Sequence, residues 1–94
     1  MNPGVGLTSR CMKNYSWENS FLEIFESCTE RYRAGSRDPE ALYMPDEMAF
    51  ISSIGYKPRE FFDFIEDSVD EGEPSPITAL LIASVRRDYF LSQQ

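Results

Sequence analysis

The sequence predicts a compact all-α domain of four helices, and the positions of its prolines and glycines carry this prediction. Pro45, Pro58 and Pro76 each open a segment, and proline suits the first helical position because the N–H group that it lacks would have no partner there. Gly55 and Gly72 close the first two segments, and glycine suits the residue just past a helix end, where φ turns positive. Within the segments apolar residues recur every three or four positions, which is the period of one helix face.

Residues 1–15 are predicted to form a flexible N-terminal arm, and residues 16–94 a single helical domain. The arm is rich in Asn, Pro, Gly, Ser and Thr, and its charged side chains are Arg10 and Lys13. A chain of 94 residues has the length of one domain, and with 41% hydrophobic and 14% aromatic residues it can build a core.

The first helix is expected over residues 17–34, with Ser16 as its N-cap and Gly35 just past its end. Its apolar residues recur at spacings of three and four and therefore lie on one face. They are Trp17, Phe21, Ile24, Phe25, Cys28 and Tyr32. In the turn that follows, Asp38 is expected to cap a short turn of helix that reaches Tyr43.

The second helix is expected over residues 45–54. Asp46 and Glu47 fall in its first turn, where the helix dipole favours negative charge. The third helix is expected over residues 58–71, with an apolar stripe that faces inward. This stripe consists of Phe61, Phe62, Ile65 and Val69.

The fourth helix is expected over residues 76–92, with Ser75 as its N-cap. Its middle, residues 79–83, is apolar on all sides, as is typical of a helix surrounded by other helices. The sequence therefore predicts that this C-terminal helix is the central element of an orthogonal or bundle-like domain.

The chain is acidic, with a net charge of −7 and a pI near 4.4. Nonspecific nucleic-acid binding and adhesion to anionic membranes both need a positive face, so neither kind of partner is expected. The charge is compatible with two kinds of partner. One is a protein with a basic surface, and the other is a second copy of the chain in a homodimer. The longest apolar run, residues 79–83, is too short to cross a bilayer, and residues 1–7 lack a basic-then-apolar leader, so a cytoplasmic location is expected.

No histidine occurs in the sequence, which excludes the commonest zinc ligand, histidine-based acid–base catalysis and His-dependent nucleophilic dyads. The sequence also has no glycine-rich phosphate loop. Cys11 and Cys28 form no Cys-x-x-Cys pair, and Cys28 is expected to be a small buried hydrophobe. We therefore predict no catalytic residue, no metal site and no cofactor.

Acidic residues concentrate around the third helix, where seven acids and one base lie between Pro58 and Pro74. Four of these acids are spaced by three or four residues and form a candidate interaction face for a basic partner or a divalent cation. They are Asp63, Glu66, Asp67 and Asp70. A solvated face that keeps the protein soluble is the alternative interpretation.

A metal-dependent all-α hydrolase is the alternative function. The pairs Glu23-x-x-Glu26 and Glu66-x-x-x-Asp70 have the forms with which some all-α nucleotide pyrophosphatases hold Mg²⁺. The gap between the two pairs is longer than in that pattern, and no basic phosphate-binding cluster follows them. This function requires the four side chains to converge.

Asp88 is predicted to be a buried structural acid that fixes how the fourth helix docks, with a ligand-binding acid as the alternative. On a helical wheel it lies between Ile77 and Leu81, and so belongs to an apolar face. A buried carboxylate must be paired or hydrogen-bonded, either to a free N–H group at a helix start or to an arginine. The candidate arginines are Arg31, Arg33 and Arg37.

The sequence as a whole favours a small noncatalytic helical protein that binds another protein. The binding face would be the acidic third helix or an aromatic patch, because Tyr and Trp are enriched in interfaces. The candidates for that patch, which suit the edge of a core equally well, are Tyr15, Trp17, Tyr32, Tyr43 and Tyr56.

Overall fold

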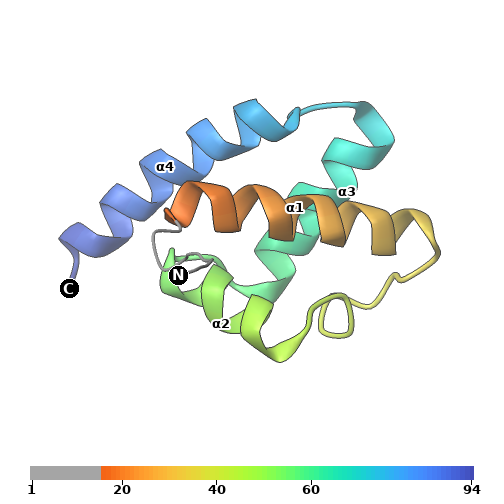
Figure 1. The fold of residues 1–94 in the computed structure, drawn as a ribbon, viewed down its shortest axis with the longest axis horizontal. Helices are drawn as coiled ribbons and strands as arrows, with labels where there is room; N and C mark the ends of the chain where they lie inside the picture. The colour runs from red at the N-terminus through yellow and green to blue at the C-terminus, as the bar shows by residue number, and fades with distance from the viewer. Residues whose placement is uncertain (1–15) are drawn as a thin grey trace, which may run out of the picture.

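The computed structural model describes residues 16–94, and in this range the chain forms four α-helices and no strand (Figure 1). The predicted all-α fold is confirmed, and each helix begins at the predicted residue. The expected arm over residues 1–15 lies outside the described residues. The helices are α1 (Trp17–Arg33), α2 (Pro45–Ser53), α3 (Pro58–Glu71) and α4 (Pro76–Ser92).

Two kinds of cap start these helices. At α1 and α4 the hydroxyl of the preceding serine, Ser16 or Ser75, accepts a hydrogen bond from a backbone N–H group of the first turn, at 3.3 Å in each case. At α2 and α3 the residue before the helix has no such side chain. There a glutamate in the first turn accepts its backbone N–H group instead, as Glu47 does for Met44 at 2.8 Å.

The chain between α1 and α2 forms turns and bends rather than helix. Asp38 accepts a hydrogen bond from the backbone N–H group of Glu40 at 2.9 Å, which closes an Asx turn. The short helical turn expected through Tyr43 is therefore absent from this segment, because the aspartate satisfies a local turn instead of starting a helix.

The helix in the middle of the domain is α1, with α4 on one side of it, α2 on the other and α3 crossing it (Figure 1). It packs against both α3 and α4, whereas α2 packs against α3. This differs from the expectation that α4 is central. The reason lies in the side chains, since the buried residues of α4 are Ala79 and Ala83, too small to fill the space between other helices.

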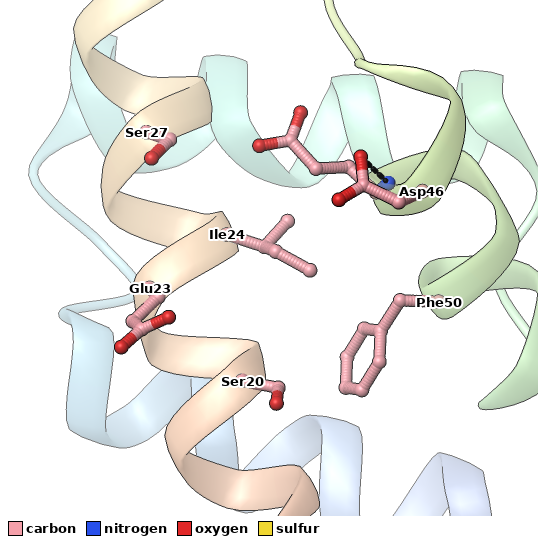
Figure 2. Close-up of a pocket in the computed structure, with 7 residues that line it drawn as sticks. Ser20, Glu23, Ile24, Ser27, Asp46 and Phe50 are labelled. Atoms are coloured by element: carbon pink, nitrogen blue, oxygen red, sulfur yellow. Dashed lines mark hydrogen bonds between the residues drawn. The ribbon is translucent and has the colours of Figure 1, made fainter. Parts of the chain in front are cut away.

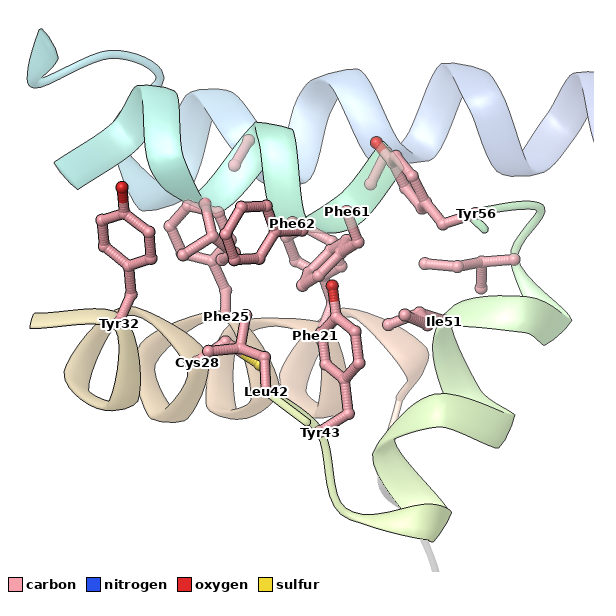
Figure 3. Packing of buried hydrophobic residues seen from close by; sticks show 14 residues of the cluster. Phe21, Phe25, Cys28, Tyr32, Leu42, Tyr43, Ile51, Tyr56, Phe61 and Phe62 are labelled. Atoms are coloured by element: carbon pink, nitrogen blue, oxygen red, sulfur yellow. The ribbon is translucent and has the colours of Figure 1, made fainter. Parts of the chain in front are cut away.

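Aromatic rings join α1 to α3 and form the centre of the core (Figure 3). The ring of Phe61 packs edge-on against Phe21 and Phe25, with centroids 5.9 and 6.3 Å apart. All three rings are buried. Such edge-to-face pairs contribute about 0.5–1.5 kcal/mol each beyond their burial. The predicted inner stripe of α3 is confirmed at Phe62 and Ile65 as well, both of which are buried.

A bidentate ion pair connects the end of α1 to the start of α2. The guanidinium of Arg31 donates to both carboxylate oxygens of Glu47, at 2.6 and 3.1 Å, and also to the carbonyl of Leu42 at 3.0 Å. Burial by itself would raise the pKa of Glu47, but the hydrogen bonds from Arg31 and from the Met44 N–H group outweigh it and lower that pKa below its ordinary value. The carboxylate is therefore held in its charged form.

Replacing Glu47 with Gln should lower the free energy of unfolding by about 2–3 kcal/mol at neutral pH, because Arg31 loses its charged partner. Folding lowers the pKa of Glu47, so its contribution is complete above the unfolded pKa, about 4.3, and is lost as the pH falls through the lower folded value. In urea unfolding, the difference between wild type and E47Q should therefore shrink below about pH 4.

Glu60 offers a matched control for this substitution. It accepts the backbone N–H group of Lys57 at 3.0 Å and pairs with Arg86, but its side chain is 42% exposed, against 11% for Glu47. Exposed pairs contribute little, so E60Q should cost less than about 1 kcal/mol. Equal losses for the two variants would contradict the assignment of the Arg31 pair as the stronger link.

Gly55 and Gly72 both have positive φ, at +94° and +80°, but only Gly55 has a close neighbour. A Cβ atom there would lie 2.9 Å from the Cβ and Cγ atoms of Phe90, whereas a Cβ at Gly72 would meet nothing within 4 Å. Gly72→Ala should cost about 1–2 kcal/mol through its backbone alone, and Gly55→Ala about 1–3 kcal/mol more through the clash. Thermal unfolding measures both, and equal losses would show that α4 does not approach Gly55 so closely.

Candidate interaction surface

One face of α4 carries large apolar side chains that nothing in the described structure covers. Ile77, Leu81, Val85 and Tyr89 follow one another at intervals of four residues, and their exposed fractions range from 61% to 72%. Ile82 lies beside them and is 45% exposed. We call these five residues the α4 stripe.

The composition of α4 explains why such a face exists. No charged residue occurs from Pro76 to Val85, so the first ten positions of this helix are uncharged all round. A helix of this kind is usually covered on every side. Here α1 covers the side of Ala79 and Ala83, and the opposite side faces outward.

Two alanines and two arginines fix α4 in place. Ala79 and Ala83 are fully buried, and such small residues let the backbones of α4 and α1 come close. In the last turns, the guanidinium of Arg87 lies 4.9 Å from the centre of the Trp17 ring, at the start of α1.

Arg86 makes three contacts with the start of α3 and the loop before it. Its guanidinium pairs with Glu60 at 2.8 Å, donates to the carbonyl of Gly55 at 3.1 Å, and stacks 4.5 Å from the centre of the Tyr56 ring. The N–H group of Lys57, together with Arg86, holds the pKa of Glu60 below its ordinary value. The C-terminal half of α4 is thus anchored on its inner side while the stripe stays outside.

A hollow adjoins each end of the stripe. The hollow at the C-terminal end has a volume of about 440 Å³ and is lined by Gly55, Val85, Arg86, Tyr89, Phe90 and Gln93. The hollow at the N-terminal end lies between α1 and α4 and is lined by Ile77, Leu22 and Phe25 together with the charged Glu26 and Arg33. Both hollows include members of the stripe, so the stripe continues into a mixed apolar and charged surface at its N-terminal end.

The four acids of the predicted interaction face lie on α3, away from the inner stripe of that helix. Asp63, Asp67 and Asp70 are exposed and Glu66 is half-buried. The hydroxyl of Tyr32 lies 3.1 Å from a carboxylate oxygen of Glu66 and 3.3 Å from one of Asp70, and can donate to either. Two of the four acids therefore share a contact within the domain, and the other two face solvent.

The four carboxylates of the hydrolase alternative do not come together. Glu23 lines a hollow between α1 and α2 with Asp46 and Phe50 (Figure 2), whereas Glu26 lines the hollow between α1 and α4. Glu66 and Asp70 lie beside Tyr32 at the end of α1. Within residues 16–94, no three Asp, Glu or Cys side chains are grouped so that they could hold a metal ion. The convergence that this function requires is not present.

Asp88 is exposed, so the prediction of a buried structural acid was wrong. Its position on the helical wheel between Ile77 and Leu81 was correct, but that face is the outward one. Two of the predicted partners are engaged elsewhere, since Arg31 pairs with Glu47 and Arg37 donates to the carbonyl of Tyr32 at 2.7 Å.

Three of the candidate aromatic residues belong to the core. Tyr32, Tyr43 and Tyr56 are buried, and the hydroxyl of Tyr43 donates to the carbonyl of Pro58 at 2.7 Å. Cys28 is also buried, as predicted, and burial raises the pKa of its thiol to about 12. It is therefore protonated at neutral pH and is not a nucleophile. Tyr89 is the exposed aromatic residue of the stripe.

Comparison with known protein families, curated proteins and solved structures finds no match. No helix within residues 16–94 has the combination of length and hydrophobicity that a membrane crossing requires.

Replacing Asp88 with Ala should change the free energy of unfolding by less than about 0.5 kcal/mol, because an exposed carboxylate leaves no buried partner behind. Urea unfolding of dilute protein measures this, with E47Q as the variant that does lose a partly buried ion pair. A loss near 3 kcal/mol for D88A would place the carboxylate in a buried ion pair after all.

Proposed function

We propose that this protein is a noncatalytic interaction module that binds another protein chain through the α4 stripe. The observation that carries this proposal is the exposure of Ile77, Leu81, Val85 and Tyr89 on one face of a helix. Soluble monomers rarely leave a contiguous apolar patch of more than a few hundred Å² in water, and larger ones mark interaction sites.

The shape of the surface favours a protein over a small molecule. The stripe runs along the outside of a 17-residue helix, and a convex helix face cannot enclose a ligand. Residues spaced by four form a ridge, and ridges of this kind pack into the grooves of another helix. The surface that covers the stripe is therefore expected to be apolar and helical.

The charge of the chain supports a protein partner over a lipid one. At a net charge of −7 the protein is repelled by anionic membranes, which weakens any insertion of the stripe into a bilayer. The acids of α3 are on a different helix from the stripe. Their charge favours the approach of basic partners over acidic ones.

The same proposal places the protein in the cytoplasm. Its support is the buried, unpaired Cys28, since extracellular domains of this size commonly rely on disulfides.

A photo-reactive amino acid at position 85 tests the proposed function in the cells that make the protein. Introduced in place of Val85, it should give a cross-linked product of discrete mass, because this side chain would lie inside the interface. The same group in place of Ser52, an exposed residue of α2, is the control and should not give that product.

The substitution Leu81→Glu provides a second test of the proposed function. A charge at this position should remove the product and weaken binding of the purified partner by at least about tenfold, which corresponds to ~1.4 kcal/mol. Ser52→Glu adds the same charge off the stripe and should leave binding unchanged. Products that form equally from positions 85 and 52, or that survive L81E, would contradict the proposal.

A further inference from the structure

We infer that the partner of the α4 stripe is the α4 stripe of a second copy of this chain, in a twofold-symmetric dimer. This inference rests on the proposed function and names the partner of the same surface. Three properties of the structure support it: the size of the stripe, the absence of charge at its centre, and the distribution of charge over the rest of the molecule.

The size of the stripe fits what a dimer of this kind needs. A standard interface takes about 800 Å² from each partner. The five large side chains of the stripe would form the apolar centre of such an interface, and the hollows at its two ends, which other elements help to line, would add to it.

The centre of the stripe can face its own copy without conflict. A twofold axis sets a surface patch against itself, so a charge near the axis would meet the same charge. Leu81, Ile82 and Val85 occupy the middle of α4 and are uncharged, and the segment from Pro76 to Val85 holds no charged residue. Residues spaced by four on both helices can interlock as ridges and grooves.

If the two α4 helices cross antiparallel at this centre, the N-terminal end of each helix lies beside the C-terminal end of the other. This crossing brings Ile77 of the second copy toward Val85 and Tyr89 of the first, which line the C-terminal hollow. Asp88 lies near the C-terminal end of each helix, at the edge of the contact, where a carboxylate stays in water.

Electrostatic repulsion disfavours pairing through the acidic part of the surface. Two copies carry −7 each, and a face of α3 presented to another α3 would set Asp63, Asp67 and Asp70 against acids. In a dimer through α4, the apolar contact would have to outweigh the repulsion between the two net negative charges. Added salt screens the repulsion and leaves the apolar contact intact, so it should strengthen the dimer.

Light scattering coupled to size exclusion of the full chain tests the inference. We expect a mass of twice 10.9 kDa for the wild type at about 0.1 mM, and 10.9 kDa for L81E and for Val85→Glu, with S52E remaining a dimer. Leu81 and Val85 are largely exposed, so both variants should keep the wild-type helical circular dichroism. Raising the salt concentration from about 0.05 to 0.5 M should leave the dimer intact or tighten it.

Three results would overturn the inference. They are a wild-type chain that stays monomeric at about 0.1 mM, a dimer that survives both L81E and V85E, and a dimer that added salt dissociates. A monomeric wild type that still cross-links to a different protein from position 85 would overturn the inference that the partner is a second copy. It would leave the proposed function standing. A monomeric wild type that gives no cross-linked product would overturn both.

Discussion

The edge-on packing of Phe61 against Phe21 and Phe25 is the contact on which the rest of this structure depends. It joins α1 to α3, and the rings of Tyr43 and Tyr56 pack against the same phenylalanine, with centroids 6.1 and 5.3 Å away. The segments on both sides of α2 therefore meet at one buried ring (Figure 3). These aromatic side chains fill the centre, and the residues with which α4 is fully buried against the domain are the small Ala79 and Ala83.

Two glutamates then connect the outer elements to this centre in the same way. Glu47 and Glu60 each lie in the first turn of a helix that begins with proline, and each accepts the backbone N–H group of the residue before the helix. Each also pairs with an arginine from another helix, Arg31 of α1 or Arg86 of α4. Each carboxylate thus caps the start of its own helix and also binds an arginine of another helix, so that one side chain holds two elements together.

The helix boundaries could be predicted because they depend on local rules. Proline at the first position and glycine after the end act through backbone geometry alone, and they placed both ends of α3 and the start of α4 correctly. The pairing of Arg31 with Glu47 could not be predicted, since it depends on how α1 and α2 meet in space. A cap at Glu47 was within reach of the sequence, but its arginine partner was not.

The α4 stripe was missed for a related reason. A helix that is apolar all round must be covered, but hydrophobic periodicity does not say whether the cover comes from the same chain or from another one. The prediction assumed that the cover comes from the same chain. It therefore placed α4 at the centre of the domain and the Asp88 side chain inside it. The size of the apolar residues held a better signal, because Ala79 and Ala83 mark the side that packs tightly, and the side chains of the α4 stripe lie on the other.

The helix proposed to bind another chain is also part of the fold of its own domain. Within its own chain α4 buries two alanines, packs Leu80 against the core and Phe90 against Gly55, and makes further contacts through Arg86 and Arg87. Its outer face carries four large apolar side chains that are more than 60% exposed. Covering that face adds to the stability of α4 by mass action, because a partner that binds only the folded helix shifts the equilibrium toward it. The alanines that let α4 dock closely on α1 are thus also the reason why the large side chains of the α4 stripe face outward.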